Sequence, residues 1–386
     1  MKRIYLDHTA TTPLDPRVLE AMTPYFSDVF GNASSVHRFG QEARSALERS
    51  RETIAAAIGA EAGELFFTSG GTESDNFAIK GVLHAGRKRG KMHIVTSLAE
   101  HHAVLDTCHS LEEEGTPVTY VPVDQHGWVS ENLVAEAVTD ETCLVSVMHA
   151  NNEVGTINPL QEIGRAAHEK GVIVHTDAVQ SLGKIPVSVQ ELGVDLMTIS
   201  AHKLYGPKGI GALYIRKGTD IDPVIHGGGQ ERGKRPGTEN VPLAAGFAKA
   251  VELATSDMQS EAKRLSGLRD MLETKIQAGF PAAIINGHPQ RRLPHILNVS
   301  FDSGKIFLEG EMLVMNMDLN GIALTSGSAC TSGSMQPSHV LLAMGRDGRT
   351  AKATLRFAFG RSNSVEDVGL VVETLHGILR QMTSSS

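Results

Sequence analysis

Between residues 65 and 215 the sequence repeats one pattern, in which a short apolar run precedes a small or polar turn and a stretch with helical spacing. The apolar runs begin near residues 65, 93, 118, 143, 172 and 196. Runs of this kind are typical of strands buried on both faces, and the helices between them make the strands parallel. The pattern therefore predicts an α/β fold, with helices on both faces of a mostly parallel sheet.

The chain is longer than a typical single domain, with 386 residues, and its second part has a different pattern. A long helical segment from about Leu243 to Ala278 follows the sheet, and strands and helices are mixed beyond it. We expect a large domain over residues 15–260. Residues 1–14 and 261–386 are expected to form a smaller α+β domain.

The composition argues against several functional classes. The formal net charge of -8 does not favour general binding to nucleic acids or acidic membranes. No apolar run approaches transmembrane length, and the N-terminus lacks a signal-peptide core. Cys108, Cys143 and Cys330 are widely spaced and form no CxxC pair, so neither a disulfide framework nor a zinc site is indicated. We expect a cytoplasmic protein that needs no metal.

A lysine follows the predicted strand that starts near residue 196. Lys203 ends the motif Ser200-Ala201-His202-Lys203, directly after the apolar run 194–199. Open α/β sheets bind ligands at the carboxyl ends of their strands. Loss of solvation there lowers the pKa of a lysine amine and makes it a nucleophile. The alternative is a surface lysine in a Gly/Pro turn, and this motif alone does not decide between the two.

Four further polar side chains follow other predicted strands of the same sheet. They are Thr72, His101, Asn152 and Asp177. Each has a simple structural explanation as a turn, helix-cap or loop residue. The pair His101-His102 beside Glu100 could also suggest a metal site, although no third ligand is evident. Chance would rarely bring all four, together with Lys203, to one edge of a sheet.

This set of residues suits pyridoxal phosphate (PLP). A carboxylate such as Asp177 would keep the pyridine nitrogen protonated, so that the ring accepts electrons when a Cα bond breaks. Gln180 could donate to the ring hydroxyl, and His101 could stack on the ring face. Backbone N–H groups and hydroxyls at Gly71-Thr72 and Ser200 could bind the phosphate.

Seven motifs are spread along the chain. They are Tyr5-Leu6-Asp7 with Ala10-Thr11-Thr12, Ser69-Gly70-Gly71-Thr72-Glu73-Ser74, Glu100-His101, Asn151-Asn152-Glu153, Asp177-Ala178-Val179-Gln180-Ser181, Ser200-Ala201-His202-Lys203, and Ser326-Gly327-Ser328-Ala329-Cys330-Thr331-Ser332-Gly333. Together they resemble the cysteine desulfurases of the nitrogen-fixation and iron–sulfur-cluster group, within the class V aminotransferases. The likeness extends from Tyr5 to about Arg361. It implies a PLP-dependent transferase of fold type I that forms a homodimer, with active sites at the subunit interface.

The resemblance also implies a role for individual residues. Lys203 would carry the cofactor, with further contacts from Gly71, Thr72, His101, Asn152, Asp177, Gln180, Ser200 and His202, and from Thr238 of the partner subunit. Asn152 and Arg356 would bind the substrate, because a bidentate guanidinium suits its carboxylate. Lys203, His101 and Cys330 are the predicted catalytic residues. His8 stands where many relatives have asparagine, and we do not expect it to contact the cofactor.

Cys330 is the residue that distinguishes the predicted reaction from the alternatives on the same fold. Its neighbours are small residues that pack poorly, whereas Cys108 and Cys143 are interpreted as small buried hydrophobes. The resemblance implies that Cys330 takes sulfur from L-cysteine as a persulfide, that L-alanine is released, and that a cluster scaffold or thiolation enzyme accepts the sulfur. The alternatives are a selenocysteine lyase, a class V aminotransferase or a non-catalytic protein of the same fold. The sequence ends soon after Met382, without the longer tail that housekeeping members use to dock a scaffold, which leaves the acceptor open.

Overall fold

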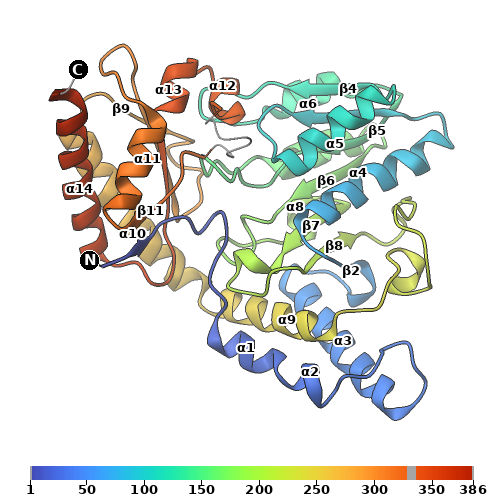
Figure 1. Ribbon diagram of the computed structural model, residues 1–386. Helices are drawn as coiled ribbons and strands as arrows, with labels where there is room; N and C mark the ends of the chain where they lie inside the picture. Colours follow the sequence, from blue (N-terminus) through green and yellow to red (C-terminus); the bar gives the residue numbers. More distant parts are fainter. Residues whose placement is uncertain (1, 328–335, 385–386) are drawn as a thin grey trace.

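The computed structural model describes residues 2–327 and 336–384 and contains a seven-stranded sheet (Figure 1). The strand order is β2 (Leu65–Thr68), β8 (Gly211–Ile215), β7 (Leu196–Ser200), β6 (Ile173–Asp177), β5 (Thr142–Ser146), β3 (His93–Ser97) and β4 (Val118–Val121). The strands from β7 to β4 pair in parallel, whereas β8 is antiparallel to both of its neighbours. The predicted α/β fold with a mostly parallel sheet is confirmed.

Helices cover both faces of this sheet because successive strand residues point to opposite sides. Leu65 and Phe67 of β2 belong to one apolar cluster, and Phe66 belongs to another. The first cluster is completed by α3 (Arg38–Ala57), α6 (Glu131–Ala137), α7 (Leu160–His168) and α9 (Val241–Ser256). The second is completed by α4 (Gly71–Arg87) and α5 (His102–Glu113). The strands are thus buried on both sides, which explains their continuous apolar runs.

A separate apolar cluster joins the two ends of the chain. Its elements are β9 (Ala283–Asn286), β10 (Ile296–Phe301) and β12 (Thr354–Ala358), which form an antiparallel sheet, and the helices α10 (Met258–Gly279), α11 (Gly310–Leu319) and α14 (Val365–Ser384). Near the N-terminus, β1 (Ile4–Tyr5) pairs in parallel with β11 (Ile322–Ala323), beside these helices in Figure 1. Ile4 and Leu6 are buried in this cluster. The cluster supports a small domain made from both ends of the chain, whose boundaries stay a prediction.

The helical segment expected from about Leu243 to Ala278 consists of two helices, α9 and α10. Asp257, with φ -104° and ψ 3°, separates α9 from α10. Apolar spacing continues across the junction, so the pattern gives no sign of a break at one residue. The two helices pack in different apolar clusters, and the segment therefore still links the large sheet to the small one.

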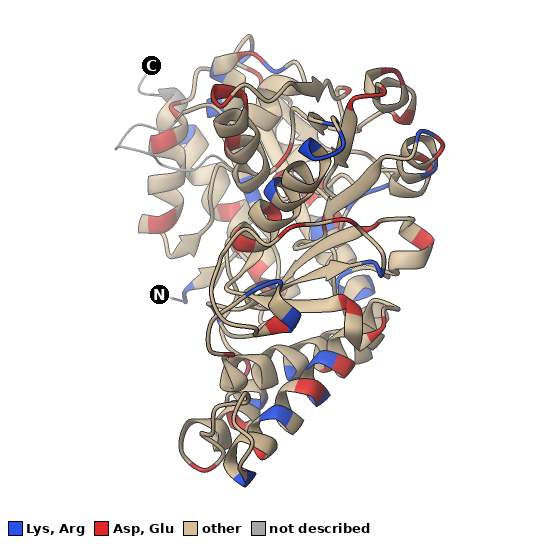
Figure 2. Ribbon diagram, turned by 90° about the vertical axis from the view of Figure 1, so that its right-hand side faces the viewer, with Lys and Arg blue, Asp and Glu red and all other residues tan. Residues whose placement is uncertain are grey.

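The other helices of the described chain are short. They are α1 (Pro16–Met22), α2 (Pro24–Ser27), α8 (Val189–Leu192), α12 (His339–Ala343) and α13 (Gly348–Lys352). Within residues 2–327 and 336–384, we find no helix with the length and apolarity needed to cross a membrane. Acidic and basic residues are interspersed over the ribbon in Figure 2.

Candidate active site

A cavity of about 250 Å³ lies at the carboxyl ends of the parallel strands. It is lined by Gly71, Thr72, Asp75, His101, Met148, Ala150, Asn152, Asp177, Val179, Gln180, Ser200, His202 and Lys203. Every cofactor residue predicted from the sequence, apart from Thr238, is in this set. The sheet order explains the convergence, because β6 and β7 are neighbours and β2 runs in the same direction as both.

Lys203 lies in the short turn η2 (Ala201–Lys203), directly after β7. Its Nζ donates hydrogen bonds to the carbonyl oxygens of Ala10, at 2.8 Å, and of Thr9. Burial and the nearby charge of Arg356 together lower the pKa of the Lys203 amine to about 8, against the opposing charge of Asp177. A larger fraction of this amine is therefore unprotonated near neutral pH than for an ordinary lysine, which favours its action as a nucleophile.

The N-terminal segment fixes the turn that carries Lys203. The Thr12 amide donates to the carbonyl of His202 at 3.1 Å, and the Thr12 hydroxyl donates to the same oxygen at 2.8 Å. The Tyr205 amide in turn donates to the Thr12 hydroxyl at 2.8 Å, and Tyr205 has a left-handed φ of 62°. Gln180 reaches the same segment through a 3.0 Å hydrogen bond to the carbonyl of Thr9. The sequence pattern predicts only a short strand and a turn here, and gives no sign of these contacts.

Two buried carboxyl groups line the cavity. Asp177 ends β6, and its Oδ1 accepts a 2.8 Å hydrogen bond from the Val179 amide. Burial raises the pKa of Asp177, whereas the positive charge of Lys203 favours its ionised form. Burial, together with repulsion from Asp177, raises the pKa of Asp75 well above its usual range. Of the two carboxyl groups, Asp75 is therefore the one whose neutral form is more strongly favoured, and it was not predicted. Its position one helical turn after Thr72 was the available signal.

His101 is the N-cap residue of α5, where its Nδ1 accepts a 3.0 Å hydrogen bond from the Ala103 amide. Burial lowers the pKa of this imidazole, so the ring faces the cavity in its neutral form. Glu100, directly before it, is fully buried and accepts hydrogen bonds from the Ser97 hydroxyl and the Met148 amide. Burial raises the pKa of Glu100 to about 8.

The first turn of α4 forms the other end of the cavity. Gly70, with a left-handed φ of 155°, precedes the helix, whose first N–H groups have no partner within it. A second hollow adjoins the cavity and shares Gly71, Thr72, Ser200 and His202 with it. Such a helix start, flanked by hydroxyls, suits a phosphate.

The donor set therefore fits PLP. The described part of the chain brings together a lysine with a lowered pKa, a buried aspartate, a neutral imidazole and a phosphate-type helix start. In addition, Asn152 Oδ1 is buried and has no hydrogen-bond partner among the described residues. A bound ligand with a donor group could supply one.

Other predicted residues lie apart from the cavity lining. Arg356, on β12, donates from Nη1 to the carbonyl of Asn152 at 3.1 Å and pairs with Asp7 at 2.9 Å. Thr238 is exposed and, within the described chain, is not part of this lining. Cys330 lies outside the described residues. The ring of His8 is buried, and its Nδ1 lies 3.0 Å from the carbonyl oxygen of Ala358.

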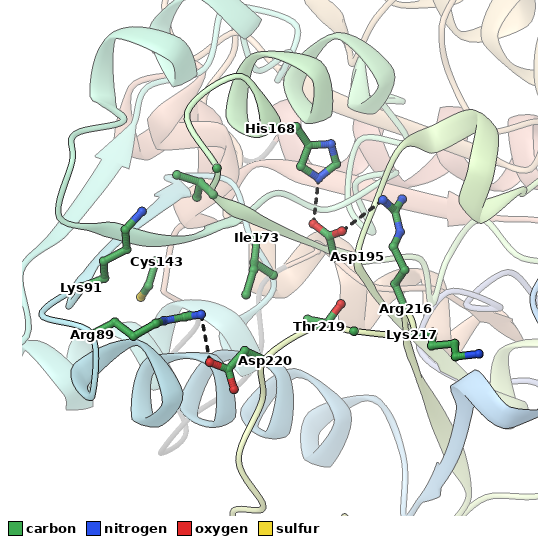
Figure 3. A pocket seen from close by; sticks show the side chains of 13 residues that line it. Arg89, Lys91, Cys143, His168, Ile173, Asp195, Arg216, Lys217, Thr219 and Asp220 are labelled. Atoms are coloured by element: carbon green, nitrogen blue, oxygen red, sulfur yellow. Dashed lines mark hydrogen bonds and ion pairs between the residues drawn. The ribbon is translucent and has the colours of Figure 1, made fainter.

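A larger cavity, of about 460 Å³, lies at the opposite edge of the sheet (Figure 3). Five of its ionisable side chains form ion pairs with one another. Arg89 lies 2.9 Å from Asp220, and Asp195 binds both His168, at 2.8 Å, and Arg216, at 3.3 Å. None of the predicted site residues lines this cavity, so it is not the candidate active site.

A family model described as Aminotransferase class-V matches residues 4–371. The chain belongs to the class-V aminotransferase family. This family consists of PLP-dependent enzymes, so the predicted cofactor and enzyme class are confirmed.

Class-V aminotransferases with full-length similarity to the chain carry more specific names. A protein from Dictyoglomus turgidum named cysteine desulfurase IscS is 50% identical, over 100% of this chain and 97% of its own length. A protein of the same name from Methanosarcina thermophila is 48% identical, over 100% of this chain and 94% of its own. A solved NifS-like protein has a TM-score of 0.91 at 41% identity, covering 98% and 100% of the two chains. A structure titled SspA in complex with cysteine has a TM-score of 0.80 at 36% identity, covering 93% and 99%.

Proposed function

We propose that this protein is a cysteine desulfurase that releases L-alanine from L-cysteine and holds the sulfur on Cys330 as a persulfide. The observation that carries the proposal is the Lys203 amine, with its lowered pKa, facing Asp177 and His101 in one cavity. Relatives that are 50% and 48% identical to this chain over nearly their whole length are named cysteine desulfurase, which supports this reaction over others of the family.

Residues of the cavity would hold the cofactor between the sheet edge and α4. Lys203 would bind it covalently, and Asp177 would face the ring nitrogen with Gln180 at the ring hydroxyl. The start of α4 at Gly71 and Thr72, with Ser200 and His202, would bind the phosphate. When bound, PLP supplies a ring that accepts electrons from the Cα of an attached amino acid.

Substrate binding is assigned to Asn152 and Arg356. The Arg356 guanidinium is buried and linked to Asn152 through its 3.1 Å hydrogen bond, which places a fixed positive charge beside the cavity. A guanidinium binds a carboxylate through two parallel hydrogen bonds. Lys203, once released from the cofactor, would move the proton at the substrate Cα as general base and acid. The neutral ring of His101 would pack on the cofactor face.

Sulfur transfer requires a second nucleophile, which is the proposed role of Cys330. Its thiolate would attack the substrate sulfur, so that an S–S bond forms as the substrate Cβ–S bond breaks. The electron pair of that bond stays with Cβ, which takes a proton and completes alanine. One cysteine thus yields one alanine and one persulfide, without an external oxidant. Cys108 and Cys143 are unsuited to this role, because burial raises the pKa of their thiols to about 12 and about 11.

The reaction can be tested by product stoichiometry. We expect purified holoenzyme to form alanine from L-cysteine and, with a reducing thiol present, to release an equal amount of sulfide. A selenocysteine lyase would instead be active on selenocysteine and nearly inactive on cysteine. An aminotransferase would need a keto acid and would convert cysteine without forming alanine from it. Either result, or a protein with bound PLP and no turnover, would overturn the proposal.

The enzyme is proposed to be a homodimer in which Thr238 completes the phosphate site of the other subunit. Thr238 is exposed and away from the described lining of its own chain's cavity, so it is available to a partner. Its loop is held at Glu231, whose carboxylate accepts hydrogen bonds from Arg51 at 2.7 Å and 2.8 Å, and from the Phe67 amide at 3.0 Å.

A mixture of two variants tests whether the site is shared. A Lys203→Ala chain combined with a Thr238→Ala chain is expected to give heterodimers with one intact site, which binds PLP as tightly as the parent. Loss of the Thr238 hydrogen bond in Thr238→Ala homodimers should weaken PLP binding about tenfold, as expected for a bond to a charged group. If PLP affinity in purified heterodimers is as weak as in those homodimers, all contacts come from one chain.

The sulfur acceptor is proposed to be a protein of iron–sulfur-cluster assembly or of thiolation. We propose that the enzyme works in the cytoplasm, because the described cysteines Cys108 and Cys143 are free thiols, as is usual for proteins of a reducing compartment.

A further inference from the structure

The carboxylate of Glu153 contacts the chain on both sides of residues 328–335. Its Oε2 accepts a hydrogen bond from the Ser338 hydroxyl at 2.5 Å. A Cβ placed on Gly327 would lie 2.7 Å from the same oxygen, so the Gly327 backbone packs directly against it. One buried oxygen therefore touches the last described residue before this segment and a residue just after it. Cys330 is three residues beyond Gly327 in the sequence.

Glu153 itself is held by a rigid loop. Its amide donates to Asn151 Oδ1 at 2.8 Å, and its carbonyl accepts from Asn298 Nδ2 at 3.2 Å. Asn151 also donates to the carbonyl of Ala99 at 2.9 Å. Since Asn298 belongs to β10 and Ala99 follows β3, the loop is tied to both sheets. The carboxylate thus has a fixed position relative to Asn152, which lines the cavity.

The two attachment points are also fixed. Ser338 caps α12 by accepting from the Leu341 amide at 3.2 Å, and His339 Nε2 hydrogen-bonds to the carbonyl of Glu100 at 2.8 Å. On the other side, the Gly327 amide donates to the Thr325 hydroxyl at 3.4 Å. Gly327 has a left-handed φ of 91°, and its contact with the Glu153 carboxylate leaves no room for a side chain.

Burying the carboxylate of Glu153 costs free energy, so stabilisation of the fold alone does not explain its position. Glu153 is only 3% exposed, and burial raises the pKa of its carboxyl group to about 7, against the Ser338 hydrogen bond and the charge of Arg356. A buried carboxylate whose hydrogen-bond partner among the described residues is a single hydroxyl is usually destabilising compared with an apolar side chain. A role in function gives a reason for a carboxylate at this place.

We propose that Glu153 is a positioning residue for sulfur transfer, which fixes both attachment points of the segment containing Cys330 beside the substrate site at Asn152. The inference rests on the proposed function, in which Cys330 is the residue that takes the sulfur. Holding a nucleophile at a defined distance from its target contributes to the rate, and a misplacement of about 1 Å can cost about 100-fold.

Three variants separate this role from simple structural support. We expect Glu153→Ala to keep the cofactor content and the KM for L-cysteine within about twofold, while kcat for alanine release falls about 10- to 100-fold. Glu153→Gln should restore most of the rate, because its amide oxygen can still accept from Ser338. Ser338→Ala should give an intermediate loss. Asp367→Ala is the matched control, since this equally buried carboxylate accepts from the Ser364 amide far from the site. It should lower Tm and leave kcat unchanged.

The inference is overturned if Glu153→Ala turns over like the parent. It also fails if kcat falls only in proportion to lost cofactor, or if Glu153→Gln is as impaired as Glu153→Ala. Cys330→Ser assayed in parallel separates this failure from that of the proposed function. If Cys330→Ser still releases alanine from cysteine, the desulfurase mechanism is wrong. If it is inactive while Glu153→Ala is unimpaired, only the positioning role is wrong.

Discussion

Replacing Lys203 with alanine is expected to abolish alanine release from L-cysteine, with a loss on the order of 10⁴-fold. Two functions disappear together, namely covalent attachment of the cofactor and proton transfer at the substrate Cα, and general acid–base catalysis alone contributes up to about 10⁴-fold. The cavity offers no substitute amine, because Lys203 is the only lysine in its described lining. Alanine formation with saturating cysteine measures the loss.

Reduction with borohydride identifies the lysine directly. Peptide mass mapping of the reduced parent enzyme should find a pyridoxyl adduct on Lys203, and the Lys203→Ala protein should carry none. Lys208→Ala is the matched control, since Lys208 is exposed and borders the adjoining hollow rather than the main cavity. An adduct on Lys208 in the parent, or no adduct at all, would contradict the assignment.

Replacing Cys330 with serine should stop sulfur transfer and leave cofactor binding intact. The serine hydroxyl is a far weaker nucleophile than a thiolate near neutral pH, so persulfide formation should be undetectable and alanine release should fall by at least about 100-fold. The variant should contain as much PLP as the parent, and its visible spectrum should still change when cysteine is added. Both are expected because the residues assigned to the cofactor, such as Lys203, Asp177 and His101, line the described cavity and are unchanged in this variant.

A control variant and a second substrate make the interpretation of the Cys330→Ser experiment more specific. Cys143→Ala should behave like the parent, because burial raises the pKa of that thiol and keeps it unreactive. Selenocysteine could partly bypass the block in Cys330→Ser, since selenium leaves more easily than sulfur. Desulfuration of L-cysteine by Cys330→Ser at the parent rate would remove the basis for the desulfurase mechanism and favour a lyase or an aminotransferase.

Several features of the site followed from local sequence. Lys203 and Asp177 were located because each follows or ends an apolar run, and the ends of parallel strands meet at one edge of a sheet. The start of α4 was recognised from the small residues of Gly70-Gly71-Thr72, which a helix start next to an anion requires. Asp75 was not predicted, because its position one helical turn after Thr72 was the only signal in the sequence that its side chain lines the cavity.

The sequence by itself determined the alternation of strands and helices, and therefore the edge at which Lys203, Asp177 and His101 lie, because periodicity and strand polarity are local properties. The tertiary structure alone decided the contacts between distant segments. Thr12 fixes the turn of Lys203, and the Glu153 carboxylate contacts both Gly327 and Ser338. The tertiary structure also decided that the helices before and after Asp257 pack in two different apolar clusters. Such contacts join residues far apart in the chain, and their formation depends on how the elements pack rather than on any pattern within one element.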